Sequence, residues 1–216
     1  MKVQDDTAYI RALISEGEHV RQDFKFEISD SRKIARSLSA FANTEGGRLL
    51  IGVKDNGRIA GVRSEEEMYM VEAAAQVYCI PAVEVDMRVY RPEGRSVLVA
   101  SVGPAVRKPV TVKEEDGSRL AYVRIADENI LATAVHIGAW KCAADSVPSK
   151  AVSFTHQEKS LLDIISSADT SGMTLSQICR RVTIPRRRVI DLLSHFVHWD
   201  LVEFCHDSHG FRYRAV

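Results

Sequence analysis

The chain has 216 residues, of which 45% are hydrophobic and 27% are charged, a composition typical of globular proteins and a length that suits one large or two small domains. Lys and Arg together number 29, as do Asp and Glu, so the net charge is zero. This balance excludes a uniformly basic nucleic-acid binder, and any such function requires basic residues gathered in patches.

The cysteine pattern and the N-terminus indicate the compartment. The four cysteines lie far apart and none forms a C-x-x-C pair, which argues against a zinc ribbon or a redox motif and fits a reducing environment. The opening MKVQDDTAYI lacks the apolar core of a signal peptide. No apolar run reaches the roughly 18 residues of a membrane span. We therefore expect a cytoplasmic protein without a membrane segment.

The N-terminal half alternates between helical and extended patterns. Residues 19–28 alternate between apolar and polar side chains, which predicts a strand with one buried face. Residues 49–53 are continuously apolar, as in a central strand. The Asp55-Asn56-Gly57 sequence predicts a tight turn, with residues 58–62 as a hairpin partner. Apolar spacing predicts helices over 7–15, 31–43 and 64–78.

Further strands are predicted over 83–89, 96–102 and 119–125, followed by a helix over 130–142. This order of strands with inserted helices predicts an α+β domain over residues 1–143. Residues 143–153 lack periodicity and contain Pro148, so they are the best candidate for a linker.

The C-terminal residues 154–216 predict three short helices and a hairpin. Thr155 with Glu158, and Thr174 with Gln177, match the capping box that opens a helix. A third helix follows Pro185, and residues 201–204 and 211–214 can pair as two strands. Three helices and a hairpin form the plan of a small winged helix-turn-helix domain, whose last helix enters the DNA major groove.

Several polar residues of this domain are candidates for nucleic-acid binding. Basic side chains gather where the third helix begins, polar ones occupy its predicted exposed face, and two arginines lie on the wing. The candidates are Arg186, Arg187, Arg188, Ser194, His198, Arg212 and Arg214. Asp191 on the same face would repel phosphate, and a winged helix used only for packing or dimerisation is the alternative.

Four motifs in the N-terminal half carry a resemblance to a known family. They are Glu18-His19-Val20-Arg21-Gln22-Asp23-Phe24-Lys25, Ala40-Phe41-Ala42-Asn43-Thr44-Glu45-Gly46-Gly47, Leu50-Ile51-Gly52-Val53-Lys54-Asp55-Asn56-Gly57 and Ile59-Ala60-Gly61. In this order they resemble the Schlafen AlbA_2 family. Weaker similarity follows at residues 107–110 and 121–124, so that the resemblance covers residues 10–135.

The resemblance implies an α+β fold with a mixed sheet, and association with nucleic acid. It also maps the acidic trio of the family's ribonucleases onto Glu18, Asp23 and Asp55. Three such carboxylates can hold Mg²⁺ or Mn²⁺, which activates water, and Lys25 could neutralise phosphate. Asp23 replaces the family's glutamate and is one methylene shorter, which puts the metal geometry in doubt.

Structural roles compete with each of these functional interpretations. Asp55 lies in a turn where Asp is favoured for local hydrogen bonding, and the Gly46-Gly47 pair is also typical of a helix end. We expect a DNA-binding transcriptional regulator without a resident cofactor, acting as a homodimer on double-stranded DNA, with RNA as a second candidate partner. The alternatives are a metal-dependent ribonuclease acting on structured RNA, centred on Glu18, Asp23 and Asp55, and a protein-interaction scaffold.

Overall fold

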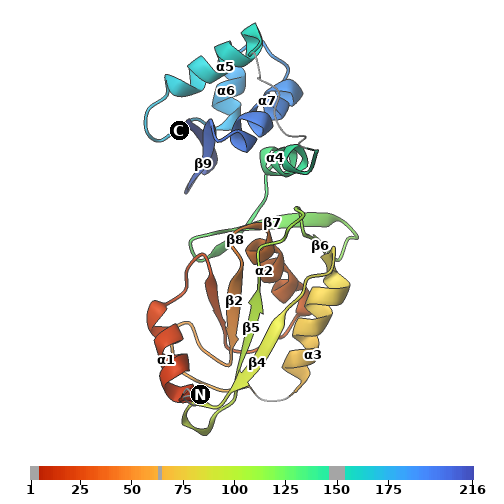
Figure 1. Cartoon of the computed structure of the whole chain (residues 1–216), viewed down its shortest axis with the longest axis vertical. Coiled ribbons are helices and arrows are strands. Elements are labelled where there is room, and N and C mark those ends of the chain that lie inside the picture. Colours follow the sequence, from red (N-terminus) through yellow and green to blue (C-terminus); the bar gives the residue numbers. More distant parts are fainter. Residues whose placement is uncertain (1–4, 63–64, 146–153) are drawn as a thin grey trace. The chain divides into compact units, whose positions relative to one another are not determined.

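The structure is a computed structural model that describes residues 5–62, 65–145 and 154–216. The chain divides into two compact units, Met1–Leu131 and Ala132–Val216, and each is considered by itself (Figure 1). In the ranges given above, no helix is both long enough and apolar enough to cross a membrane.

The first unit is an α+β structure with two four-stranded sheets. The first sheet has the order β1-β2-β5-β4 and is mixed, because β1 and β2 are parallel while its other pairs are antiparallel. The second sheet has the order β3-β6-β7-β8. The strands are β1 Gln22–Lys25, β2 Gly47–Ile51, β3 Cys79–Ile80, β4 Asp86–Tyr90, β5 Val97–Val102, β6 Thr111–Lys113, β7 Arg119–Ile125 and β8 Glu128–Leu131.

Helices α1 and α2 of this unit begin at side chains that cap their free N–H groups. The Asp5 carboxylate accepts from the N–H of Thr7, and the Asp30 carboxylate accepts from that of Arg32. The helices are α1 Asp6–Glu16, α2 Ser31–Asn43 and α3 Glu66–Ala73, which continues as the π-helical turn η1 Ala74–Tyr78; a 3₁₀ turn, η2, covers Pro92–Gly94. The bounds predicted for α2 are confirmed.

The two faces of the first sheet pack against different helices. Leu50 of the central strand β2 faces α1 and packs with Ile10 and Leu13. Its neighbours Leu49 and Ile51 face the opposite way and pack with α2, which also contacts β6 and β7 of the second sheet. Because successive strand residues alternate between faces, the apolar run 49–53 supplies both cores.

The strand predicted over 19–28 is shorter and more buried than the sequence pattern indicates. Only β1 is extended, and Gln22, Asp23 and Phe24 are all buried, so the prediction of one polar face is wrong. The Gln22 side-chain amide donates to the carbonyls of Leu13 and Gly17 at 2.6 and 2.7 Å, which satisfies it inside the protein.

Residues 58–62, predicted as a hairpin partner, are not assigned as a strand, although Ile59 forms an isolated bridge with Val53 and the carbonyl of Arg58 accepts the N–H of Lys54. The preceding turn is confirmed, with Gly57 at a φ of 76°. Three strands, β3, β6 and β8, were not predicted, because segments of two to four residues are too short to show a period.

The second unit contains four helices and a hairpin within its described residues. Both predicted capping boxes are present, at Thr155 with Glu158 and at Thr174 with Gln177. An isolated bridge joins Met173 to Tyr213 and extends the hairpin by a third short segment. This arrangement is consistent with a winged helix-turn-helix. The elements are α4 Ala134–Asp145, α5 His156–Ser166, α6 Leu175–Arg181, α7 Arg186–His198, β9 Val202–Asp207 and β10 Gly210–Ala215.

Helix α4 packs against α7 in the second unit, although the sequence pattern placed it at the end of the first domain. The Ser194 hydroxyl donates to the carbonyl of Val135 at 3.3 Å, and a side chain at Gly138 would overlap Ser194. The chain therefore divides into its two compact units after Leu131, whereas the sequence pattern placed the end of the first domain at residue 143. Of the expected linker 143–153, the first three residues end α4 and the rest lies outside the described residues.

His136 of α4 is buried against the hairpin. Its ring stacks on Phe204 with centroids 3.7 Å apart and planes 6° apart. Burial lowers the pKa of His136 to about 4. Nδ1 also accepts the N–H of Thr133 at 3.1 Å, which requires an unprotonated nitrogen. The folded second unit therefore contains the neutral imidazole.

This burial predicts an acid-sensitive second unit. The folded pKa lies below the usual value near 6.5, so the unfolded chain binds the proton more readily as the pH falls from about 6.5 to about 4. Over that window we expect a loss of about 3 kcal/mol of unfolding free energy. Both tryptophans, Trp140 and Trp199, lie in this unit, so urea titrations followed by their fluorescence report on it.

The variant His136→Phe keeps the ring stack and removes the titrating group. Its urea midpoint should change much less between these pH values than that of the wild type. An unchanged pH dependence in the variant would show that other groups cause it.

Candidate functional site

A buried arginine organises the region around β1. The side chain of Arg124, from β7, is 1% exposed. Its guanidinium donates to the carbonyls of His19 and Gln22 at 3.4 and 3.2 Å, and to the Asn129 side chain at 2.9 Å. It also lies 3.4 Å from a carboxylate oxygen of Asp23. A buried charge with these partners fixes β1 against the second sheet.

Asp23 is therefore paired inside the protein. One carboxylate oxygen lies near Arg124, and the other lies 2.7 Å from Nζ of Lys25. Asp23 and Lys25 share one side of β1. Because two cations already balance this carboxylate, a metal ion would have to compete with both of them.

Glu18 lies next to Asp23. One Glu18 carboxylate oxygen accepts the N–H of Phe24 at 2.9 Å. Burial and a hydrogen bond with Asp23 raise the pKa of Glu18, because both favour its protonated form. Glu18 therefore keeps its proton to a higher pH than a free glutamate does.

The structure does not bring Asp55 into this pair. Asp55 is exposed in the turn that follows β2. Across the described parts of the chain, no three His, Cys, Asp or Glu side chains are grouped closely enough to hold a metal ion. The predicted trio of Glu18, Asp23 and Asp55 is therefore a pair and a separate turn residue.

The residues 40–47, which carry part of the family resemblance, have packing roles. The Asn43 amide donates to the carbonyls of Val110 and Tyr122, at 2.8 and 2.9 Å, and so joins α2 to the second sheet. Gly46 has a φ of 75°, and a Cβ there would lie 2.8 Å from the carbonyl oxygen of Val102. A Cβ at Gly47 would overlap the Phe41 ring. This motif specifies the end of α2 and the start of β2.

In the second unit, the first turn of α7 carries three exposed arginines, Arg186, Arg187 and Arg188. The preceding Pro185 provides no side-chain cap, and the turn contains no acidic residue. Free N–H groups and the positive end of the helix dipole therefore lie beside three positive charges. A bound anion would relieve this local repulsion.

The predicted exposed face of α7 needs one correction. Ser194 is 2% exposed, and its hydroxyl donates to the carbonyls of Ile190 and Val135. The prediction that Ser194 faces nucleic acid is wrong, because α4 covers this flank of α7. His198 is half-buried, and Asp191 is exposed as predicted.

The two wing arginines have carboxylate partners. Arg212 lies 2.6 Å from Asp207, and Arg214 lies 2.5 Å from Glu203. Arg214 also donates to the carbonyl of Thr170 at 2.8 Å. A phosphate on the wing would therefore have to share these arginines with carboxylates already in contact.

A family model for the Schlafen AlbA_2 domain matches residues 18–133, more than half of the chain, including the Glu18 and Asp23 pair and Arg124. The chain belongs to the Schlafen AlbA_2 family. Among curated proteins, no relative matches. The match ends close to the boundary between the two compact units.

Solved structures resemble the chain at low identity. The DIP2311 protein of Corynebacterium diphtheriae aligns at 15% identity with a TM-score of 0.46, over 78% of this chain and 42% of that one. The N-terminal domain of a RecG-related protein from Nitrosomonas europaea aligns at 20% identity with a TM-score of 0.41, over 71% of this chain and 97% of that domain. This chain therefore spans less than half of the first of these proteins.

The pairing of Arg124 with Asp23 predicts a large cost for removing the arginine. In Arg124→Met, Asp23 loses one of its two cations and two backbone carbonyls lose a donor. We expect the unfolding free energy of the first unit to fall by about 3–5 kcal/mol. Urea unfolding followed by far-UV circular dichroism measures this, while tryptophan fluorescence reports on the second unit.

Arg119→Met is the matched control, because Arg119 lies on the same strand and is exposed. It should change stability by about 0.5 kcal/mol or less. Equal stability of the two variants would contradict the structural role assigned to Arg124.

Proposed function

We propose that this protein binds double-stranded DNA through the start of α7 and acts as a transcriptional regulator. The observation that carries the proposal is the group of three exposed arginines in the uncapped first turn of a 13-residue helix. Among the described residues, none of their side chains has a hydrogen bond or an ion pair. Such a helix end is suited to phosphate contacts and to bidentate contacts with guanine.

The form of the second unit supports this proposal. Helix α5, the bridged segment at Met173, helices α6 and α7, and the hairpin β9–β10 follow one another in the order of a winged helix-turn-helix. We propose that this unit reads DNA and that the AlbA_2 unit adds affinity or dimer contacts. A homodimer would place two copies of α7 on paired half-sites.

Charge reversal tests the proposal directly. Each of Arg186→Glu, Arg187→Glu and Arg188→Glu should weaken binding to a mixed-sequence duplex and make its salt dependence shallower, by about one unit of slope for each phosphate that the variant no longer neutralises. Fluorescence anisotropy at several salt concentrations measures both quantities. The three residues are exposed, so the variants should fold.

Lys159→Glu is the control, because Lys159 is an exposed cation on α5 of the same unit. It makes the same change in net charge away from α7. If the arginine variants retained the wild-type affinity and salt slope, or if Lys159→Glu weakened binding as much as they do, the assignment of α7 would be wrong.

The ribonuclease alternative receives less support from the geometry, because Asp55 lies apart from Glu18 and Asp23. A cleavage assay tests this alternative directly. Incubation of tRNA with the protein and Mn²⁺ would yield fragments, and Asp55→Ala would abolish them, if these residues formed a nuclease centre. Fragments that persist in Asp55→Ala would not come from such a centre.

A further inference from the structure

An open cavity of about 570 Å³ lies in the first unit where β1 and β2 begin and β5 ends. Its lining includes three nitrogen-bearing side chains, His19, Arg21 and Arg48. Glycines 46, 47 and 103 form part of its wall. It is separate from the carboxyl pair described above, since neither Glu18 nor Asp23 lines it.

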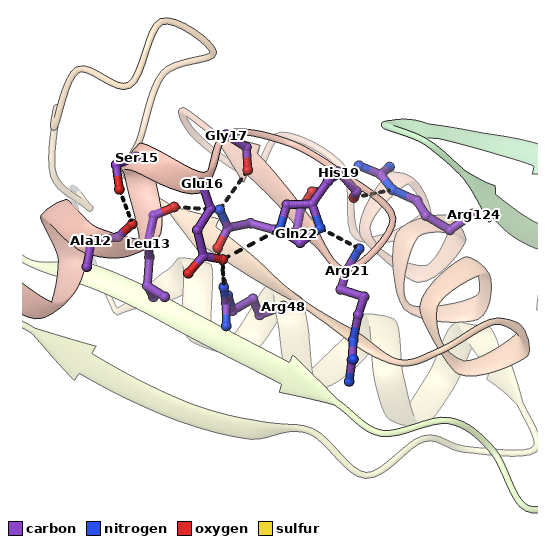
Figure 2. Close-up of polar contacts among 10 residues, drawn as sticks. All are labelled: Ala12, Leu13, Ser15, Glu16, Gly17, His19, Arg21, Gln22, Arg48 and Arg124. Carbon is purple, nitrogen blue, oxygen red and sulfur yellow. Dashed lines mark hydrogen bonds and ion pairs between the residues drawn. The ribbon is translucent and has the colours of Figure 1, made fainter.

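Arg48 is held rigidly at this cavity. Its Nε donates to the Gln22 side-chain carbonyl at 2.6 Å, and its guanidinium pairs with Glu16 (Figure 2). Gln22 is itself fixed by the carbonyls of Leu13 and Gly17. An arginine positioned in this way loses little side-chain entropy when it contacts a ligand.

Arg21 differs from Arg48 in having no side-chain partner among the described residues. Its backbone N–H donates to Nδ1 of His19 at 3.2 Å, which holds the main chain. Its side chain is exposed and extends away from the network of Gln22 and Arg48 in Figure 2. The cavity thus has one fixed guanidinium and one that is available to a ligand.

The glycines that line the cavity leave room for a ligand close to the backbone. Gly46 and Gly47 cannot carry a side chain, because a Cβ would contact Val102 or Phe41. Gly103 is different: a Cβ there would meet no atom within 4 Å, so it borders open space. A substitution at Gly103 can therefore change the cavity without a clash.

The charge of the lining narrows the class of ligand. Glu16 balances Arg48, and Glu45 also lines the cavity, so its net charge is small. A highly charged anion would meet both carboxylates. A singly charged phosphodiester could instead receive two parallel hydrogen bonds from the Arg21 guanidinium. The cavity suits one group of this kind.

We infer that this cavity binds one phosphodiester of a nucleic-acid backbone, with Arg21 as its main contact and Arg48 behind it. The inference rests on the proposed function and deepens it, because it gives the AlbA_2 unit a direct contact with DNA. It assigns no base specificity, since a phosphate contact positions the duplex without reading its sequence.

Two variants test the inference on the full chain. Arg21→Gln removes the guanidinium, and Gly103→Asp places a carboxylate in the open space. Each should weaken binding to a short mixed-sequence duplex by about five- to tenfold at about 0.1 M salt and reduce the salt slope by about one. Gly103→Ala and Arg119→Gln are the matched controls and should keep the wild-type affinity.

The outcomes separate this inference from the proposed function. If the wild type binds the duplex and both Arg21→Gln and Gly103→Asp bind equally well, the cavity assignment fails while the α7 assignment stands. If the wild type does not bind, both fail. Calorimetry with inorganic phosphate separates a nucleic-acid phosphate from free phosphate. If the wild type binds phosphate and Arg21→Gln does not, while both bind the duplex with the same affinity, the cavity is a site for free phosphate and the inference is overturned.

Discussion

The buried guanidinium of Arg124 is the constraint on which the first unit depends. A charge that is 1% exposed is stable only when carboxylates and carbonyls surround it. Asp23 and the carbonyls of His19 and Gln22 supply that surrounding. These contacts fix the position of β1 against the Arg124 side chain, which comes from β7 of the second sheet. The cavity lined by His19 and Arg21 is thereby given its shape, because these residues directly precede the anchored part of β1.

Pairing with carboxylates also distinguishes the charged side chains that stabilise the fold from those that can bind a ligand. The chain is neutral overall, and many of its arginines are paired with carboxylates, as Arg212 and Arg214 are on the wing. Affinity for a polyanion then depends on exposed cations whose side chains make no ion pair with another described residue. Arg21 in the first unit, and the arginines at the start of α7 in the second, are of this kind. A neutral protein can in this way present basic patches.

The sequence predicted the parts of the fold that depend on local patterns. Helix α2, strand β7 and both capping boxes follow from spacing within a few residues. The burial of Asp23 could not be predicted, because it depends on Arg124, which lies far away in the sequence. Ser194 was predicted to be exposed, and this was wrong for a similar reason. Helical spacing predicts which side of α7 a residue lies on, but it does not predict that another helix, here α4, covers that side.

The motif residues illustrate how far a family resemblance reaches. Of the residues that it named, Glu18, Asp23 and Lys25 lie together in the structure, while Asp55 is not grouped with the other two carboxylates. Asn43, Gly46 and Gly47 are explained by hydrogen bonding and close packing. Arg21 and Arg48 carried no signal of their own, since only the folded chain brings them to one cavity.

The most direct test of the central claim is amide hydrogen exchange of the full chain with and without duplex DNA. The first-turn amides of α7 have no partner within the helix, so they should exchange quickly in the free protein. If α7 contacts the backbone of DNA, exchange at residues 186–188 should slow when the duplex is bound. Bound duplex with unchanged exchange at these residues would contradict the account and place the DNA elsewhere on the protein.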